Sequence, residues 1–150
     1  MSIEVKELLS LLPAYRLKSV NRSNNVSIVG AQVRSESPAE HSWSMIVLAD
    51  YLMTGLDLDL DRKKIYDLCI YHDLVETYAG DICITDIEGR ENKDLQERHA
   101  FEKLCEELPN ILILKYRKLF EEYLAQDSKE AQFVRAVDTL DPILQAIDHK

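Results

Sequence analysis

The segment YHDLVETYAGD, residues 71–81, places His72, Asp73 and Glu76 at the end of an apolar run. His72 lies seven residues after Ile65 and four before Glu76, and Asp73 lies three before Glu76. In a helix this spacing brings the three polar side chains onto one face, which the apolar stripe turns inward. A buried carboxylate is costly unless it is paired, protonated or bound to a metal, so the segment predicts a functional site.

Two further polar residues lie beside apolar stripes elsewhere in the chain. His41 precedes Met45 by four residues and Leu48 by seven, so it begins the core stripe of its helix. The positive end of the helix dipole there favours the neutral imidazole, which is the form that binds metals. Asp138 directly follows Val137, at the edge of the last apolar stripe. Both side chains are therefore expected to reach the interior from different helices.

Four side chains on three predicted helices offer nitrogen and oxygen ligands: His41, His72, Asp73 and Asp138. Such a set suits a divalent transition metal such as Mn, Co, Fe, Ni or Zn better than an ion that prefers oxygen alone. Water bound to such a metal becomes a hydroxide nucleophile near neutral pH, which is a common route to phosphoester hydrolysis. The set therefore predicts metal-assisted hydrolysis.

Each of these residues also has a simpler explanation. A single histidine near a helix start, such as His41, is usually a capping or surface residue. Glu76 could pair with a nearby lysine, and Asp138 could bridge to Arg135. Asp141 directly precedes a proline, so it is expected to mark a helix kink rather than to bind a metal. The joint occurrence of His, His-Asp and Asp beside three apolar faces favours one shared site.

Apolar patterns with helical spacing predict the elements that position these residues. The predicted helices span residues 3–12, 38–55, 61–78, 92–107, 110–126 and 129–147. Because no sustained alternation is present, the fold class is expected to be all-α, a helical bundle of about six helices. Residues 19–36 lack such a pattern and are expected to form a long irregular loop, a feature that is often functional.

Several residues mark where these helices begin and end. In SPAEH, Ser37 suits the N-cap, Pro38 suits the first helical position, and Glu40 completes a capping box. Pro13 is expected to stop the first helix. Gly80 is expected to follow the end of the third helix.

Length and composition limit the class of protein. A chain of 150 residues that is 46% hydrophobic is expected to form one domain over residues 1–150. No apolar run is long enough for a membrane span, and the start lacks the pattern of a signal peptide. The three cysteines form no CxxC pair, which suits reduced thiols and a cytoplasmic location.

The net charge of −9 disfavours binding to nucleic-acid polymers, which relies on neutralising many phosphates. A small anionic substrate remains compatible with this charge, because a metal or a local arginine can outweigh it. Between residues 13 and 36 the charge is reversed, with one acid against four basic residues, Arg16, Lys18, Arg22 and Arg34. This stretch is interpreted as an anion-facing loop, although a solvated loop is the more frequent explanation of such a local excess of charge.

The pattern of His41, His72-Asp73 and Asp138 resembles the H…HD…D signature of the HD-domain superfamily of metal-dependent phosphohydrolases. The strings RSESPAEHSW, HDLVETYAGDI and VDTLDP are more closely similar to one branch of it. That branch is the HD-domain 5'-deoxynucleotidases, which remove phosphate from deoxynucleoside 5'-monophosphates. The likeness extends from about Leu17 to Asp141, which is most of the chain.

The resemblance implies a role for each matching residue. One divalent metal (Mn, Co, Ni, Fe, Zn or Mg) would be bound by His41, His72, Asp73 and Asp138. Glu76 would act as the acid or base near the metal, with a pKa raised by burial. Asp81 would position water or help to bind a second metal. Arg22 or Arg34 would contact the substrate phosphate.

Two departures from the family pattern leave the substrate open. Relatives place a tryptophan after the arginine of the first loop, whereas this chain has NRSNNVSIVG, so the base and sugar preferences are not settled. The chain also stops soon after Asp138, where relatives usually carry another helix or two. A C-terminally short HD domain is therefore expected.

Other functions remain compatible with the same metal site. They are an HD-type phosphodiesterase, a guanosine polyphosphate hydrolase, and a non-catalytic nucleotide-binding module. The expected partner is a small phosphorylated substrate, a nucleoside monophosphate, with no nucleic-acid polymer and no membrane. Relatives are commonly dimers, so a homodimer is expected as well.

Overall fold

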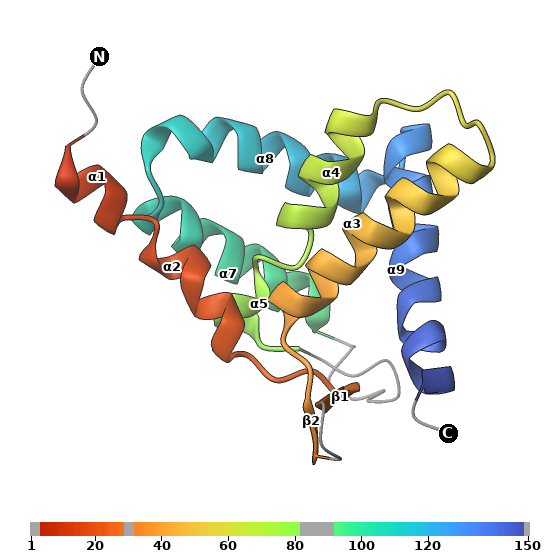
Figure 1. Ribbon diagram of the computed structural model, residues 1–150. Helices are drawn as coiled ribbons and strands as arrows, with labels where there is room; N and C mark the ends of the chain where they lie inside the picture. The colour runs from red at the N-terminus through yellow and green to blue at the C-terminus, as the bar shows by residue number, and fades with distance from the viewer. Residues whose placement is uncertain (1–3, 29–31, 82–91, 149–150) are drawn as a thin grey trace.

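Helices with one apolar face pack around two clusters of buried side chains (Figure 1). The computed structural model describes residues 4–28, 32–81 and 92–148. The longer helices are α3 (Pro38–Gly55), α4 (Arg62–Tyr71), α7 (Lys93–Glu107), α8 (Asn110–Ala125) and α9 (Lys129–Asp148). The short helical segments are α1 (Val5–Leu9), α2 (Leu12–Tyr15), the 3-10 turn η1 (Arg16–Ser19) and α5 (Glu76–Ala79).

This architecture confirms the all-α fold class expected from the sequence. The helices predicted over 92–107, 110–126 and 129–147 agree with α7, α8 and α9 to within one residue at each end. Among the helices of the described residues, none combines the length and apolar character that crossing a membrane would require.

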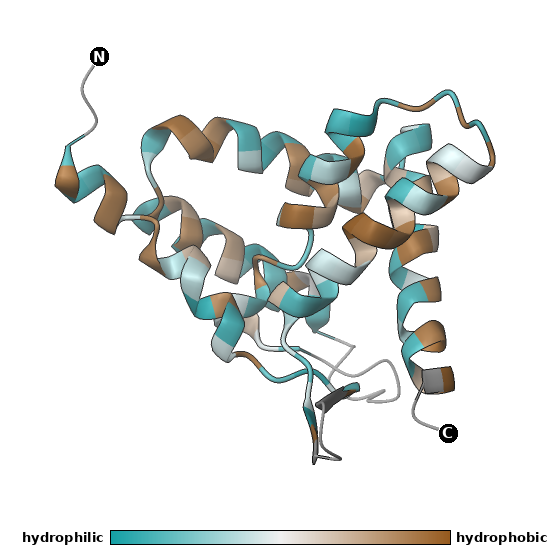
Figure 2. Ribbon diagram, viewed as in Figure 1, coloured by the Kyte–Doolittle hydropathy of each residue, from teal (hydrophilic) through white to brown (hydrophobic). Residues whose placement is uncertain are grey.

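The first buried cluster lies where α3, α4, α8 and α9 meet. Its members include Met45, Ala49 and Met53 from α3, Ile65, Leu68 and Cys69 from α4, and Val134 and Val137 from α9. Apolar and polar residues alternate along α8 and α9, as expected for helices with one buried face (Figure 2). The cluster therefore joins the three helices that carry the predicted metal ligands.

The second buried cluster lies between α7, α8 and the chain that follows α4. The rings of Phe101 and Phe120 stack in it with their centroids 4.4 Å apart. Leu74 and Val75 join the cluster from the turn between α4 and α5. Burial of these two apolar side chains anchors the segment on which His72 and Glu76 lie.

The start of α3 is as predicted from SPAEH. The Glu40 main-chain N–H donates to Ser37 Oγ at 3.3 Å, and the Ser37 main-chain N–H donates to the Glu40 carboxylate at 2.9 Å. These reciprocal bonds form the capping box. They fix the entry of α3 into the bundle, and His41 lies in its first turn.

The single helix predicted over residues 61–78 is wrong, because it is broken after Tyr71. Residues 72–75 form turns, and the Glu76 main-chain N–H donates to the Asp73 carbonyl oxygen at 2.9 Å. The apolar pattern hides the break, since Leu74 and Val75 are buried even though both lie within the turn.

Two predictions for the N-terminal region are also wrong. Residues 19–36 contain an antiparallel hairpin of β1 (Asn25–Ile28) and β2 (Gln32–Ser35), whose strands are too short to show a clear alternation. Pro13 does not end the helical region, because it lies in the first turn of α2. Proline is tolerated there, since the N–H that it lacks would have no helical partner.

Gly80 follows α5 with a φ of +74°, a backbone conformation that favours glycine. Gly80→Ala is expected to lower the free energy of unfolding by about 1 kcal/mol, because alanine is strained at positive φ. Crowding plays no part, since an added Cβ would meet nothing within 4 Å. Urea denaturation followed by circular dichroism measures the change.

Gly55→Ala is the matched control for this experiment. An added Cβ at Gly55 would also meet nothing within 4 Å, and the residue ends α3 without a positive φ. The free energy of unfolding should stay the same or rise. Equal losses in the two variants would contradict the assignment of strain to Gly80.

Candidate metal centre and catalytic pocket

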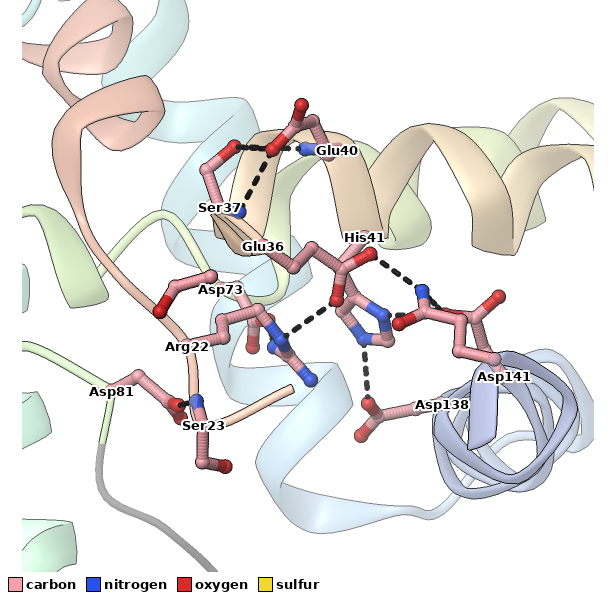
Figure 3. Close-up of polar contacts among 12 residues, drawn as sticks. Arg22, Ser23, Glu36, Ser37, Glu40, His41, Asp73, Asp81, Asp138 and Asp141 are labelled. Carbon is pink, nitrogen blue, oxygen red and sulfur yellow. Dashed lines mark hydrogen bonds and ion pairs between the residues drawn. The ribbon is translucent and has the colours of Figure 1, made fainter. Parts of the chain in front are cut away.

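The four predicted metal ligands meet where α3, α4 and α9 come together. One ligand atom from each of His41, His72 and Asp73 lies within 4.8 Å of the other two. Asp138 Oδ1 lies 3.0 Å from His41 Nε2 and 4.0 Å from His72 Nε2. Figure 3 shows His41 and Asp138 facing each other, with Asp73 nearby. Residues far apart in the sequence thus present two nitrogens and two carboxylates to one point.

Each histidine ring is oriented by a bond at its outer nitrogen. His72 Nδ1 lies 3.0 Å from the Cys69 carbonyl oxygen, which can only accept, so Nδ1 donates to it and Nε2 is turned toward the other candidate ligands. His41 Nδ1 lies 2.8 Å from Asp141 Oδ2, which orients its Nε2 in the same way. Acceptors behind the rings of metal-binding histidines commonly have this effect.

His72 Nε2 is the atom that argues most directly for a cation. It is buried, lies 3.2 Å from Asp73 Oδ2, and receives no hydrogen bond from any residue that the structure describes. A buried polar nitrogen without a hydrogen-bond partner is unfavourable. A divalent ion between these atoms would satisfy both, so the donor set fits a metal.

The pKa of His41 differs from what the helix dipole alone predicts. Burial lowers the pKa of His41, but its hydrogen bonds with Asp138 and Asp141 outweigh burial and raise the pKa to about 9. The expectation that the ring is neutral is therefore wrong, because two acids of α9 favour the imidazolium. A metal and a proton would compete for the same Nε2 atom.

The cluster opens into a cavity of about 700 Å³, a volume within the usual range of small-molecule sites. One group of lining residues is polar and includes Arg22, Asp73, Glu76 and Asp81. Another group is largely apolar and includes Phe120, Leu124, Pro142 and Ile143. A cavity with this combination can take a ligand that has both a charged end and a flat or apolar part.

Glu76 lies in this cavity as the buried acid that the sequence predicted. Its side chain is 4% exposed, and no group in the described ranges hydrogen-bonds to its Oε2. Burial, together with the negative charges of Asp73 and Asp81, raises the pKa of Glu76 well above its usual range. The carboxyl can therefore hold a proton at neutral pH, as a general acid must.

The two candidate arginines lie in different environments. Arg22 lines the cavity, and its guanidinium donates to Asp73 Oδ2 at 2.8 Å. Arg34 is about half exposed, pairs with the capping residue Glu40, and is not among the residues lining the cavity. The geometry therefore favours Arg22 as the cation that a substrate anion would meet.

Asp81 lies at the same cavity and is tied to the strand that follows Arg22. Its Oδ2 accepts a hydrogen bond from the Ser23 main-chain N–H at 3.1 Å (Figure 3). The bond connects the end of α5 with the approach to β1. The carboxylate is thereby placed within the cavity beside Glu76.

The sequence did not point to several residues that shape the site. Asp141, expected only to mark a kink, accepts a hydrogen bond from His41, and α9 continues through Pro142. The spacing of Asp138, Asp141 and Gln145 could have shown this, because residues three and seven apart share a helix face. Tyr123, whose hydroxyl donates to Asp138 Oδ2 at 2.7 Å, had no comparable signal.

The chain is similar to known sequences over most of its length. A family model described as HD domain matches residues 14–150. The protein 5'-deoxynucleotidase HDDC2 of Bos taurus is 34% identical over 117 residues, which is 78% of this chain and 56% of that protein. The protein of the same name from Homo sapiens has the same identity and the same coverage. The chain thus spans little more than half the length of these curated relatives.

Similarity to a solved structure also extends over most of the chain. The crystal structure of a protein described as a predicted metal-dependent phosphohydrolase from Magnetospirillum magnetotacticum superposes with a TM-score of 0.79 at 29% identity. The match covers 93% of this chain and 68% of that one. The likeness therefore includes the helices that carry the candidate ligands.

Competition between metal and proton gives a test in solution. Mn²⁺ affinity should rise with pH up to about 9, because His41 loses its proton as the pH approaches that pKa. Between pH 6.5 and 7.5 the affinity should change by about tenfold for each proton displaced. Calorimetric titration in buffers of different ionisation enthalpy measures both the affinity and the protons released.

His99→Ala is a suitable control, because His99 is exposed on α7 and does not line the cavity. It should bind Mn²⁺ with the same pH dependence as the unmodified protein. An affinity that is independent of pH, with no protons released, would contradict the competition.

Proposed function

Since this chain belongs to the HD domain family, we propose that it is a divalent-metal-dependent phosphohydrolase that removes phosphate from (deoxy)nucleoside 5'-monophosphates. The observation that carries the proposal is the buried His72 Nε2, unpartnered among the described residues, beside His41, Asp73 and Asp138. The cavity that opens from this point also holds a raised-pKa acid, Glu76, and a cation. The curated relatives named 5'-deoxynucleotidase support the choice of substrate class.

The metal would be held by His41, His72, Asp73 and Asp138. When bound, a divalent ion lowers the pKa of water and offsets charge on phosphate oxygens. The donor set suits Mn, Co, Ni, Fe or Zn. Mg is the sixth metal that the resemblance to the family implies. The homodimer and the cytoplasmic location implied by the resemblance stay predictions.

The chain's own residues would manage the proton and the charge. Hydrolysis forms a bond between phosphorus and the oxygen of water and breaks the bond between phosphorus and the 5' oxygen, so the water loses a proton and the leaving oxygen gains one. Glu76 would donate that proton, since its raised pKa keeps it protonated until it is used. Arg22 would pair with the phosphoryl oxygens, and Asp81 would orient the attacking water.

Replacing Glu76 tests whether the site is catalytic. Glu76→Gln should keep its metal and lower kcat by roughly 10²- to 10⁴-fold, because the amide has a similar shape but supplies no acidic proton. The assay is phosphate release from ribo- and deoxyribonucleoside 5'-monophosphates, using chelated protein resupplied with single metals. His72→Ala should lose the metal as well as the activity. Metal retention without turnover in the unmodified protein would instead favour a non-catalytic binding module.

A pair of arginine variants tests which cation meets the phosphate. Arg22→Ala should lower kcat/KM by at least about 100-fold, because it removes a charge-assisted contact in a partly buried place. Arg34→Ala should change kcat/KM by less than about threefold, since its partner is the exposed Glu40 and such pairs contribute little. The reverse order of effects would assign the phosphate contact to Arg34.

A further inference from the structure

Glu36, between β2 and α3, is a charged residue that no metal or catalytic role explains. Its side chain is 1% exposed, so ionising it requires nearby partners. We infer that Glu36 is a positioning residue: it holds the Arg22 guanidinium in the cavity where the substrate phosphate would bind. This inference rests on the proposed function, because the phosphate is the anion that Arg22 would meet.

The backbone and the side chain of Glu36 both hold Arg22. The Arg22 main-chain N–H donates to the Glu36 carbonyl oxygen at 2.8 Å, and the Glu36 N–H donates to the Asn24 carbonyl oxygen at 2.8 Å. Glu36 Oε2 lies 3.4 Å from Arg22 Nε (Figure 3), an ion pair in which neither atom has a hydrogen-bond partner among the described residues. The guanidinium therefore lies between two acids, with the charge of Glu36 beside its Nε and a hydrogen bond to Asp73 at its tip, 2.8 Å long.

A bound metal would change the negative charge of only one of the two acids beside Arg22. Asp73 is a candidate metal ligand, so its negative charge would be shared with the ion. A divalent ion would also repel the nearby guanidinium. Glu36 is not one of the proposed metal ligands, so it would remain beside Arg22 as a negative charge, together with Asp81. Without Glu36, fewer contacts would hold the Arg22 guanidinium in the cavity.

Glu36 is itself held by a chain of polar contacts that ends at the metal centre. Gln145 Nε2 donates to Glu36 Oε1 at 2.5 Å and to Asp141 Oδ2 at 3.1 Å. Asp141 in turn holds His41 Nδ1 at 2.8 Å. Arg22, the proposed contact for the phosphate, is thus connected to His41, a candidate metal ligand, through Glu36, Gln145 and Asp141.

The same contacts disfavour a second metal among these residues. The carboxylate and imidazole atoms of Glu36, His41 and Asp141 lie within 4.8 Å of one another. However, the amide N–H groups of Gln145 point at both carboxylates, and a metal would have to displace them. Both acids are already supplied with donors, which suits a supporting role.

Glu36→Gln separates positioning from structure, because it removes the charge that faces Arg22 but keeps the size of the side chain. Its amide oxygen can still accept from Gln145, so the metal ligands should be undisturbed. In Zn²⁺-loaded protein, the affinity for inorganic phosphate should fall by about tenfold, which is the scale for one charged contact. The affinity for Zn²⁺ should change by less than about twofold.

A second readout does not depend on phosphate or on activity. The Nε–Hε signal of Arg22 in a ¹H–¹⁵N spectrum, identified by its loss in Arg22→Lys, reports how firmly the guanidinium is held. In Glu36→Gln this signal should move toward those of exposed arginines and exchange faster with water. Glu36→Asp, which keeps the charge on a shorter side chain, should recover part of both effects.

Glu102→Gln is the matched control, because Glu102 pairs with Arg117 on the exposed surface of α7 and α8. It should leave the Arg22 signal and phosphate affinity unchanged. An unchanged Arg22 signal and phosphate affinity in Glu36→Gln would overturn the inference, as would equal losses of Zn²⁺ affinity, phosphate affinity and melting temperature. If the unmodified protein neither binds phosphate nor hydrolyses nucleotides, the proposed function fails, whereas the Arg22 signal still tests the contact with Glu36.

Discussion

The burial of His41 between two carboxylates of α9 is the interaction on which the site depends. Its ring is fully buried, and each nitrogen faces an acid, Asp138 at 3.0 Å and Asp141 at 2.8 Å. Such a contact is stable only if α3 and α9 pack closely, and they do so through the first apolar cluster. Losing either carboxylate would leave a polar ring in a dry interior. Packing and chemistry therefore constrain the same helix pair.

The break after Tyr71 is the second constraint. A continuous helix would carry all its polar side chains along one straight face, whereas the turn lets His72 end α4 and lets Glu76 begin α5. Leu74 and Val75 stabilise the turn by burial in the second cluster, and Gly80 allows the chain to leave α5 at positive φ. The two apolar clusters thus hold the two halves of the HD segment at an angle that regular helix geometry would not give.

Charge within the cavity is balanced locally rather than by the protein as a whole. The chain carries a net charge of −9, yet Arg22 is surrounded by Glu36, Asp73, Glu76 and Asp81. Desolvation and mutual repulsion keep one of these acids, Glu76, protonated, while the arginine pairs with others. The site can therefore offer a proton and a cation to an anionic ligand, even though the surrounding protein is acidic.

Much of the site was predictable because short-range periodicity reports which face of a helix is buried. His41, His72, Asp73, Glu76 and Asp138 each interrupt an apolar stripe, and the capping box and Gly80 mark helix ends through local backbone chemistry. The tertiary structure alone decided what depends on contacts between elements. It brought Asp141 to His41, which reversed the protonation expected from the helix dipole, and it placed Glu36 against Arg22 and Gln145. Such pairings join residues up to 109 positions apart, and no local pattern encodes which distant side chain will fill a given contact.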